Sequence, residues 1–312
     1  MANQSAKKAL MALLVVTVIW GWTFSWMKEA IDTASGEVGD ALPLIVGVFM
    51  TVRFGVAAVL MPALVSGARV GMWRGSAWRD GGILAFFLLA GFLLQMFGLD
   101  GVDPAVSAFL TSLYVAFTAL IAAVMSRTSP GLVAIIGVGL VTVGAAFISG
   151  PPQLSFDLPE WLTVLCAVLF AGHIVATDKI TRRSPPLTVA WTSFVWVTFG
   201  SAVLWGIGWG LEPSVTSGQL VSLLGAEGFI RPALLAGVLG SLVALSLLTN
   251  FQKFLSPVRA AILYSLEPVW AALIALAVGQ TSLDGWLLFG GCLLLVGNLW
   301  MEIWPRLRGK RV

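Results

Sequence analysis

A glutamate and a proline lie side by side in a stretch that is apolar for about twenty residues after Arg259. A carboxylate at bilayer depth is costly, so Glu267 should face a cavity or a partner and is a candidate functional group. It could hold a substrate ammonium group, carry a coupling proton or pair with a buried base. Pro268 lacks a backbone donor and crowds a preceding carbonyl, so we predict a helix kink at this point.

A second group of polar residues has helical spacing. Ser107, Thr111, Tyr114 and Thr118 follow one another at i, i+4, i+7 and i+11, which places them on one face of an otherwise apolar helix. A polar stripe should face protein or water and not lipid, so we expect it to line a cavity. The alternative is that the hydroxyl groups bond their own backbone carbonyls one turn back.

Other residues in the apolar runs are candidates for the same cavity. Trp20, Trp22 and Gln95 combine amphipathic rings with an amide, which suits a small organic ligand, although core packing would also explain them. His173 is the only histidine of the chain. It could relay protons, or it could be a hydrogen-bonded structural group.

Arg53 lies well inside another apolar run, in the sequence MTVRFGVAA. An arginine at that depth needs a carboxylate or several carbonyl groups around it. One role is a structural ion pair with Glu267, and the other is to bind the carboxylate of a substrate. The sequence leaves both roles open.

Several functional motifs are missing from the sequence. There is no GxxxxGK[ST] loop, no HExxH and no TVGYG filter, so an ATP-driven pump, a zinc hydrolase and a potassium channel are not expected. A single histidine cannot form a multi-histidine metal site. We therefore expect no cofactor and no metal, and we do not expect an enzyme.

The composition excludes a soluble globular protein. Of the 312 residues, 58% are hydrophobic and only 11% are charged, whereas soluble domains carry roughly a quarter charged residues. The mean hydropathy is +0.95. The sequence shows no basic face with interleaved aromatic residues, so nucleic acid is not an expected partner and the lipid bilayer is. The fold class we predict is an all-α integral membrane protein.

Ten apolar runs are long enough to cross a bilayer core of roughly 30 Å. They span approximately 9–31, 43–65, 81–99, 104–125, 130–149, 158–178, 187–209, 231–251, 257–279 and 284–304.

Charge alternates between the joints that connect these runs. Basic residues occupy the N-terminal tail and every second joint, and acidic residues dominate the others. By the positive-inside rule both termini should be cytoplasmic, which requires an even number of spans. The basic residues are Lys7, Lys8, Arg69, Arg74, Arg79, Arg127, Lys179, Arg182, Arg183, Lys253 and Arg259, with a basic tail after residue 305.

The two halves of the chain are similar in sequence. A shift of 153 residues aligns 102–144 with 255–297 without a gap, and it matches Pro104 with Pro257, Ser112 with Ser265, Gly137 with Gly290 and Gly144 with Gly297. It also makes Tyr264 the counterpart of Thr111, and Glu267 the counterpart of Tyr114, so Tyr264 joins the candidate cavity residues. A second, shorter echo with a shift of 151 pairs Trp22 with His173.

Five spans in each half is an odd number, so the second half must enter the membrane from the opposite side. Such inverted repeats commonly support alternating access to a site near the midplane. We predict a first five-helix repeat at 1–149, a periplasmic connector at 150–157, a second repeat at 158–305 and a basic cytoplasmic tail at 306–312. The symmetry is complete within one chain, so a functional monomer is expected.

The chain resembles the EamA type of the drug/metabolite transporter superfamily. The resemblance covers nearly the whole chain and rests on WGWTF with Lys28, on Arg53-Phe54, on AFLTSLYV at 108–115 and on QKFLSPVRAAILYSLEPVWAAL at 252–273. Members of that family usually have a proline near Thr118 and a glutamate where Gln280 stands.

The resemblance implies a carrier in the bacterial inner membrane that exports small metabolites. A cavity with tryptophan, tyrosine and one carboxylate suits a zwitterion with an apolar side chain, so we expect aromatic and other neutral amino acids as substrates, with or without coupled protons. The alternatives are a nucleobase, a riboflavin-like molecule or a lipophilic cation. A membrane-embedded enzyme that uses Glu267 and His173 as acid and base is a further alternative.

Overall fold

The computed structural model describes residues 2–125, 127, 132–147, 150–151, 156–255, 263–264 and 266–307. The only regular secondary structure in these residues is helical, with no strand. Several expectations lie outside the described residues: Arg259, the repeat positions Pro257 and Ser265, connector residues 152–155 and most of the basic tail.

The first half contains six helices, because its fourth span is divided in two. Their bounds are α1 Ala2–Val38, α2 Leu42–Leu64, α3 Gly75–Asp100, α4 Pro104–Thr111, α5 Tyr114–Met125 and α6 Leu132–Phe147, with a short 3₁₀ turn η1 at Ser66–Arg69.

The second half begins with α7 and also contains interrupted spans. Its helices are α7 Leu158–Thr181, α8 Pro186–Leu211, α9 Ser217–Gly225, α10 Glu227–Leu235, the π-helical η2 Ala236–Val243, α11 Ala244–Phe251, the 3₁₀ turn η3 Gln252–Phe254, α13 Glu267–Ala277 and α14 Gly285–Leu307.

The helix lengths agree with a polytopic membrane protein. In the described part of the chain, seven helical stretches are long and apolar enough to cross a membrane, and three shorter apolar helices add to them. Together they agree with the ten predicted spans. Proline stands in the first turn of α2, α4, α7, α8 and α13, where its missing N–H would be unpaired in any residue.

Three features differ from the sequence expectation. The fourth span is not one continuous helix, because it breaks at Ser112 and Leu113. The eighth span is α-helical at both ends but passes through the π-helical turn η2 in its middle. Helix α9 lies in a joint that the hydropathy pattern left without structure, and its first turn is capped by Thr216, whose hydroxyl accepts from the backbone N–H of Gln219.

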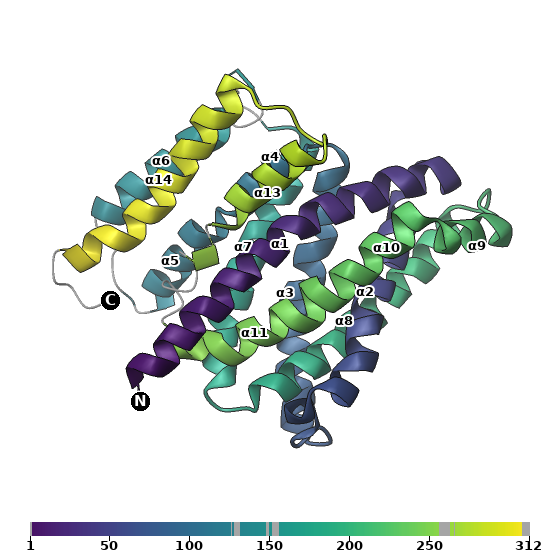
Figure 1. Ribbon diagram of the computed structural model, residues 1–312, viewed down its shortest axis with the longest axis horizontal. Helices are drawn as coiled ribbons and strands as arrows, with labels where there is room; N and C mark the ends of the chain where they lie inside the picture. Colours follow the sequence, from purple (N-terminus) through teal and green to yellow (C-terminus); the bar gives the residue numbers. More distant parts are fainter. Residues whose placement is uncertain are drawn as a thin grey trace.

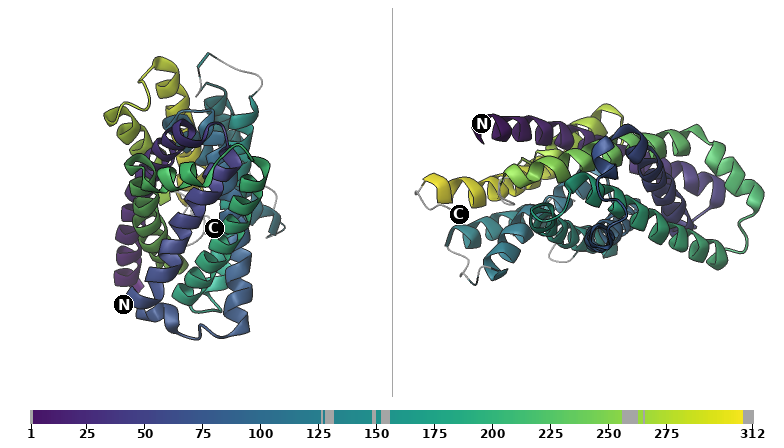
Figure 2. Two further views of the ribbon diagram at one scale, coloured as in Figure 1. Left: turned by 90° about the vertical axis from the view of Figure 1, so that its right-hand side faces the viewer. Right: turned by 90° about the horizontal axis from the view of Figure 1, so that it is seen from below.

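Helix contacts repeat when the two halves are exchanged. Helix α3 packs on α7 as α11 packs on α1, and α5 packs on α7 as α13 packs on α1. The pairs α2–α8 and α6–α14 join corresponding helices of the two halves, and α4 packs on α13, so the corresponding fourth and ninth spans also meet. Figures 1 and 2 show α6 and α14 at one edge of the molecule and α2 and α8 at the other, with α1, α3, α7 and α11 between them.

The contact between α6 and α14 follows the repeat residue by residue. A Cβ added at Gly144 would lie 2.8 Å from the carbonyl oxygen of Gly290, and a Cβ added at Gly297 would lie 3.0 Å from that of Gly137. These are the glycines that the shift of 153 aligns, so each half presents the same surface to the other. Small residues allow membrane helices to approach this closely.

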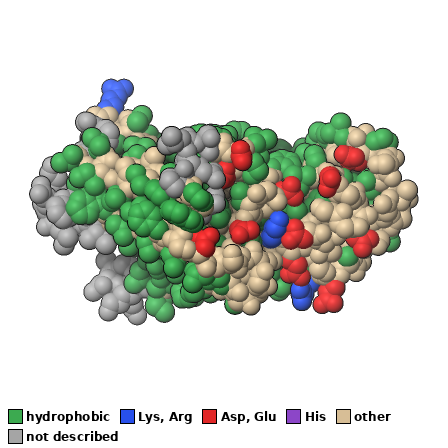
Figure 3. All heavy atoms as spheres, turned by 90° about the horizontal axis from the view of Figure 1, so that it is seen from above, with side chains coloured by type: hydrophobic (Ala, Val, Ile, Leu, Met, Phe, Trp, Pro, Cys, Tyr) green, Lys and Arg blue, Asp and Glu red, His purple; other side chains and the backbone are tan. Residues whose placement is uncertain are grey.

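The two ends of the bundle differ in charge. Helix α1 begins and α14 ends toward the same end, whereas α7 begins toward the opposite end (Figure 1). Figure 3 shows that opposite end, where Asp and Glu side chains gather and few Lys or Arg are visible. The exposed acids of the corresponding joints include Asp32, Asp40, Asp100, Asp103 and Asp284. The predicted alternation of charge therefore separates the ends of the folded chain.

Candidate functional site

Two helices begin at equivalent positions in the centre of the bundle. Helix α5 begins at Tyr114 and α13 begins at Glu267, and these residues are 153 positions apart, as in the sequence alignment of the halves. Pro268 stands in the first turn of α13, so the expected kink takes the form of a helix start, with Leu266 in a turn before it. Helices α5 and α13 therefore begin at the same depth in the bundle.

The two equivalent residues bind each other. Tyr114 donates a hydrogen bond from its Oη to Oε2 of Glu267 over 3.2 Å, and both side chains are buried. Residues related by a two-fold axis can touch only if they lie on or near that axis. Glu267 also lies in the first turn of α13, where the helix dipole favours a negative charge.

A cavity of about 40 Å³ adjoins this pair, within about 500 Å³ of empty space that includes its open mouth. Both tyrosines and the only histidine of the chain line it. The lining comes from α1, α3, the break in the fourth span, α7, α11 and α13. Its residues are Trp20, Thr23, Leu88, Phe92, Gln95, Thr111, Tyr114, Phe170, His173, Ile174, Leu245, Leu248, Tyr264 and Glu267.

Aromatic and amide contacts fix the wall around Tyr264. Its ring lies 5.6 Å from that of Trp20 and 6.5 Å from that of Tyr114, measured between centroids. Tyr264 donates to Oε1 of Gln252 over 3.4 Å, and Gln252 donates to the carbonyl of Ile174 over 2.8 Å. Because its hydroxyl is held by Gln252, Tyr264 does not bond Glu267.

The opposite wall carries polar groups that are not fully hydrogen-bonded. Gln95 donates to the hydroxyl of Thr111 over 3.3 Å, and Thr111 lies 3.6 Å from the sulfur of Cys166. Oε1 of Gln95 is buried without a hydrogen-bond partner in the described part of the chain. His173 likewise makes no hydrogen bond to any described residue, although it is only 4% exposed. The cavity can therefore offer an amide oxygen, an imidazole and a carboxylate to a guest.

Three residues of the predicted cavity lie elsewhere. Ser107 is fully buried in α4 outside the cavity, and its hydroxyl has no partner among the described residues. Thr118 is fully buried in α5, does not reach the cavity, and its hydroxyl has no described partner, so it does not bond its own backbone. Trp22 is 38% exposed, stacks on Trp26 and lines a second cavity of about 1030 Å³. The second cavity also contains Glu29 and Arg231. The shorter sequence repeat therefore aligns two residues with different surroundings: Trp22 lines the second cavity, and His173 lines the central one.

Arg53 is fully buried but does not pair with Glu267. Its Nε donates to Oγ of Ser241 over 3.0 Å and its Nη1 to the sulfur of Met27 over 3.5 Å. Glu267 bonds Tyr114 instead, so the structural ion pair considered from the sequence is absent from the described residues. The guanidinium stacks on Phe92, with 4.1 Å between Cζ and the ring centroid.

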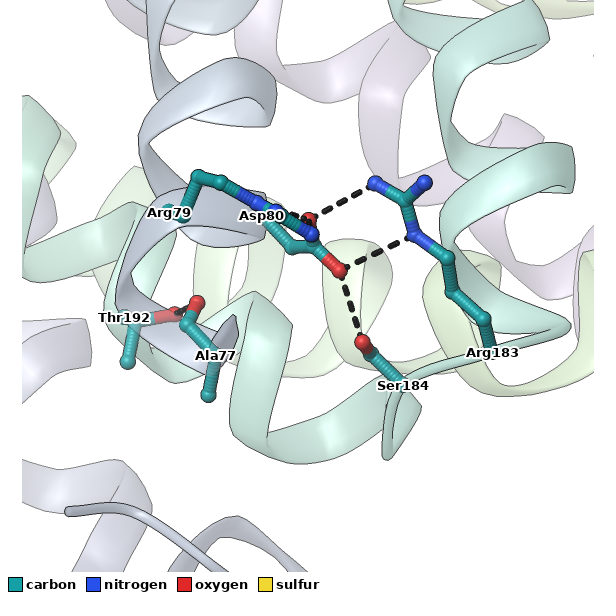
Figure 4. Close-up of polar contacts among 6 residues, drawn as sticks. All are labelled: Ala77, Arg79, Asp80, Arg183, Ser184 and Thr192. Atoms are coloured by element: carbon teal, nitrogen blue, oxygen red, sulfur yellow. Dashed lines mark hydrogen bonds and ion pairs between the residues drawn. The ribbon is translucent and has the colours of Figure 1, made fainter. Parts of the chain in front are cut away.

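An ion network joins the halves at the basic end (Figure 4). Asp80 on α3 accepts from Arg183, with 2.7 Å to Nη2 and 3.2 Å to Nε, and from the hydroxyl of Ser184 over 2.7 Å. Arg79 adds a weaker contact of 3.2 Å to the same carboxylate. The carboxylate is buried, with 1% of its side chain exposed.

A second ion pair joins the halves at the other end. Helix α3 supplies the acid of the first pair, whereas α10 in the second half supplies the base of this one. There the base, Arg231, is on α10 and the acid, Glu29, is on α1, and the two side chains form an ion pair that also includes Glu227 at 3.7 Å. Arg231 is 53% exposed and Glu29 30% exposed. The two arginines are equally exposed, so the ends differ in their acids: the carboxylate of Asp80 is buried, whereas that of Glu29 is partly exposed beside the second cavity.

Sequence reasoning missed the apolar part of the wall and the support of the broken span. Phe92, Phe170 and Leu245 line the cavity but cannot be told from core residues in a chain so rich in apolar side chains. Asn298 on α14 donates to the carbonyl and to the hydroxyl of Ser112, each over 3.3 Å, and so satisfies the break between α4 and α5. A lone asparagine in an apolar run is the signal that could have found it.

Comparison with known proteins agrees with this architecture. The EamA-like transporter family matches residues 7–150 and again residues 158–302. A relative from Archaeoglobus fulgidus, described as an uncharacterized transporter, is 26% identical over 287 residues, which cover 92% of this chain and 83% of that protein. A crystal structure of a protein with 18% identity covers 94% of this chain and 98% of its own, with a TM-score of 0.58, and this likeness shows the fold alone.

The family match covers both halves and nearly all of the chain. The helices, the repeat and the match together identify a multi-pass membrane protein that belongs to the EamA-like transporter family.

Proposed function

We propose that this transporter moves aromatic and other neutral amino acids by alternating access around the central cavity. The observation that supports this most directly is the buried Glu267–Tyr114 pair, which lies where the two repeats meet and is enclosed by aromatic side chains. A carboxylate suits the ammonium group of an amino acid, and the rings of Trp20 and Tyr264 suit an apolar side chain.

The two ion pairs support the alternation. Each joins one half of the chain to the other at one end of the bundle, and the two differ in burial. In the proposed cycle the Asp80–Arg183 pair closes the basic end while the exposed end opens, and the halves rock to exchange these roles. The protein acts as a monomer in the bacterial inner membrane, with its basic end and both termini in the cytoplasm, and the net flux is export.

The test is uptake and counterflow of labelled phenylalanine, methionine and threonine in liposomes that hold the purified protein, with and without a pH gradient. We expect saturable flux of unchanged substrate that is lost in Glu267→Gln. Thr118→Val is the matched control, because Thr118 is buried on the same polar stripe but outside the cavity. If Glu267→Gln instead keeps counterflow but loses the response to the pH gradient seen in the wild type, Glu267 carries a coupled proton and does not hold the substrate.

Other outcomes would redirect the proposal. No flux of any amino acid would refute the substrate assignment and favour a nucleobase, a riboflavin-like molecule or a lipophilic cation, which similar walls would suit. A chemically altered product would favour the membrane-embedded enzyme that uses Glu267 and His173, which line the same cavity.

A further inference from the structure

Arg53 is a buried charge without a counter-charge. Among the carboxylates whose side chains the structure describes, none forms an ion pair with its guanidinium. Two of its nitrogens meet a hydroxyl and a thioether, and Nη2 has no hydrogen-bond partner in the part of the chain that the structure describes. Phe92 and Phe54 supply ring faces at 4.1 and 5.3 Å from Cζ. Neutral contacts of this kind hold a guanidinium in place but leave its charge without an anion.

The π-helical turn η2 forms a cradle for this side chain. A Cβ at Gly237 would lie 2.6 Å from the carbonyl oxygen of Arg53, and a Cβ at Gly240 would lie 3.4 Å from Nη2. Ser241 is the hydroxyl that accepts from Nε. Turns of this type inside α-helices are frequent at functional sites. Nη2, the one guanidinium nitrogen without a partner among the described residues, is thus next to a position where a side chain is missing.

A single layer of side chains separates Arg53 from the central cavity. Phe92 and Thr23 line the cavity, and both also border the Arg53 cradle. The methyl group of Thr23 would lie 2.8 Å from a Cβ at Gly240, close to Nη2. The carbonyl of Gly240 accepts from the indole of Trp20 over 3.2 Å, which ties η2 to the cavity wall. A rotation of Phe92 or a small shift of η2 would open Arg53 to a guest.

We infer that Arg53 is an anion subsite that binds the carboxylate of the transported molecule when this wall opens. The free Nη2 and the second N–H of Nη1 provide a fork from which a carboxylate can accept two hydrogen bonds, while Nε stays on Ser241. The inference deepens the proposed function, because it requires a carboxylate on the substrate. The subsite itself does not require that the substrate be an amino acid.

The first test measures ligand stabilisation and needs no transport. Purified protein in detergent is unfolded by heat with phenylacetate or with phenylacetamide, which share a ring but differ in charge. We expect phenylacetate to raise the unfolding midpoint and phenylacetamide to leave it unchanged. Arg53→Met should abolish the shift, and Arg182→Met should retain it, because the exposed Arg182 pairs, among the described residues, only with Asp178 one turn back and belongs to neither ion pair that joins the halves. Equal stabilisation by the two ligands would overturn the inference.

A second variant covers the case in which Arg53→Met does not fold. Gly240→Ala keeps the charge but fills the space beside Nη2, so we expect it to weaken phenylacetate binding by about tenfold. The matched control is Gly55→Ala on α2, where a Cβ would make only an ordinary contact of 3.6 Å with Thr198. Unchanged binding of phenylacetate in Gly240→Ala would contradict the subsite.

Competition in liposomes separates this inference from the substrate assignment. In the wild type, phenylalanine should compete for uptake about tenfold better than phenethylamine, which lacks the carboxylate. Arg53→Lys should narrow that preference and leave phenethylamine unaffected. If no amino acid is transported but phenylacetate still stabilises the protein through Arg53, the proposed substrate fails and the anion subsite stands. If phenylalanine is transported with no preference over phenethylamine, the subsite fails and the carrier stands.

Discussion

Glu267 has one protein partner in the described structure, and that partner is Tyr114. Tyr114→Phe should therefore lower stability, because it leaves a buried carboxylate without its donor. A double-mutant cycle of Tyr114→Phe with Glu267→Gln should give a coupling free energy of about 1–2 kcal/mol in thermal unfolding. The same cycle with Tyr264→Phe should give a value near zero, because the hydroxyl of Tyr264 bonds Gln252. Equal coupling in both cycles would contradict the geometry of the site.

A second prediction concerns the contribution of Asp80 to stability. Asp80→Asn removes the charge that Arg183 holds through two nitrogens. Arg183 is 53% exposed and can be hydrated once its partner is neutral, so we expect a loss of about 2 kcal/mol rather than the 3–5 kcal/mol of a fully buried pair. The control is Asp178→Asn, which breaks a one-turn pair with the exposed Arg182 and should cost below about 0.5 kcal/mol. Thermal unfolding in detergent measures both, and similar losses would refute a special role for Asp80.

At this scale the sequence predicts polar cavity residues better than their partners. Tyr114, Tyr264, Glu267, Gln95 and His173 attract attention because a polar group in a membrane span is costly unless it faces a cavity or a partner. Their partners lie on neighbouring helices. Hydropathy shows how deep a residue lies in the membrane but not which helix lies beside it. For that reason Arg53 and Glu267, the two charges at depth, seemed natural partners in the sequence, whereas in the fold Arg53 lies under η2 and Glu267 bonds a phenol.

The contact between α6 and α14 can be tested with two glycine-to-alanine substitutions in α6, which should change stability in opposite directions. Gly144→Ala would bring a Cβ to within 2.8 Å of the backbone oxygen of Gly290 and the backbone nitrogen of Leu294, neither of which can yield easily. Gly139 lies on the same helix with nothing within 4 Å of an added Cβ. Gly139→Ala should stabilise α6 by up to about 1 kcal/mol, because alanine is the better helix former. Gly144→Ala should lower the unfolding temperature, and a rise in both variants would mean that the two helices do not touch there.

Element boundaries show where periodicity ceases to be informative. The runs of α2, α7 and α8 are predicted to within a few residues because they are apolar and begin near prolines. The break at Ser112 and Leu113 has no proline, and Asn298 of a distant helix adds a hydrogen bond to the Ser112 carbonyl beside the local one from the N–H of Val115. The turn η2 likewise depends on the packing of Gly237 against α2. Tertiary contacts of this kind create irregular backbone that no local pattern encodes.

For the whole molecule, the charge difference between the ends predicts an orientation that labelling can test. Ser76 in α3 and Ser217 in α9 are exposed at the basic and the acidic end. In a Cys292→Ser background, with Cys166 buried, each serine is replaced by cysteine. We expect an impermeant maleimide to label Ser217→Cys in intact cells and Ser76→Cys only after the membrane is permeabilised. The reverse pattern would invert the proposed orientation and with it the direction of export.

The overall architecture was the most predictable level, because the repeat is written in the sequence itself. Gly137, Gly144, Gly290 and Gly297 align by number and then meet in space. The depth at which the halves face each other follows from the same shift, which pairs Tyr114 with Glu267 in the sequence alone. The burial difference between the two ends did not follow, because it depends on how far the halves are tilted and not on their sequences separately.

The bond between Tyr114 and Glu267 also bears on ancestry. In a homodimer of five-helix subunits, a residue on the two-fold axis faces a copy of itself, so the pair would be two glutamates or two tyrosines. Two carboxylates would repel each other at bilayer depth, and two phenols would hold no charge. A glutamate that faces a tyrosine at this position requires that the two halves carry different residues there, so each half must be able to mutate independently. Gene duplication and fusion make that possible, so this site is one that a symmetric ancestor could not have possessed.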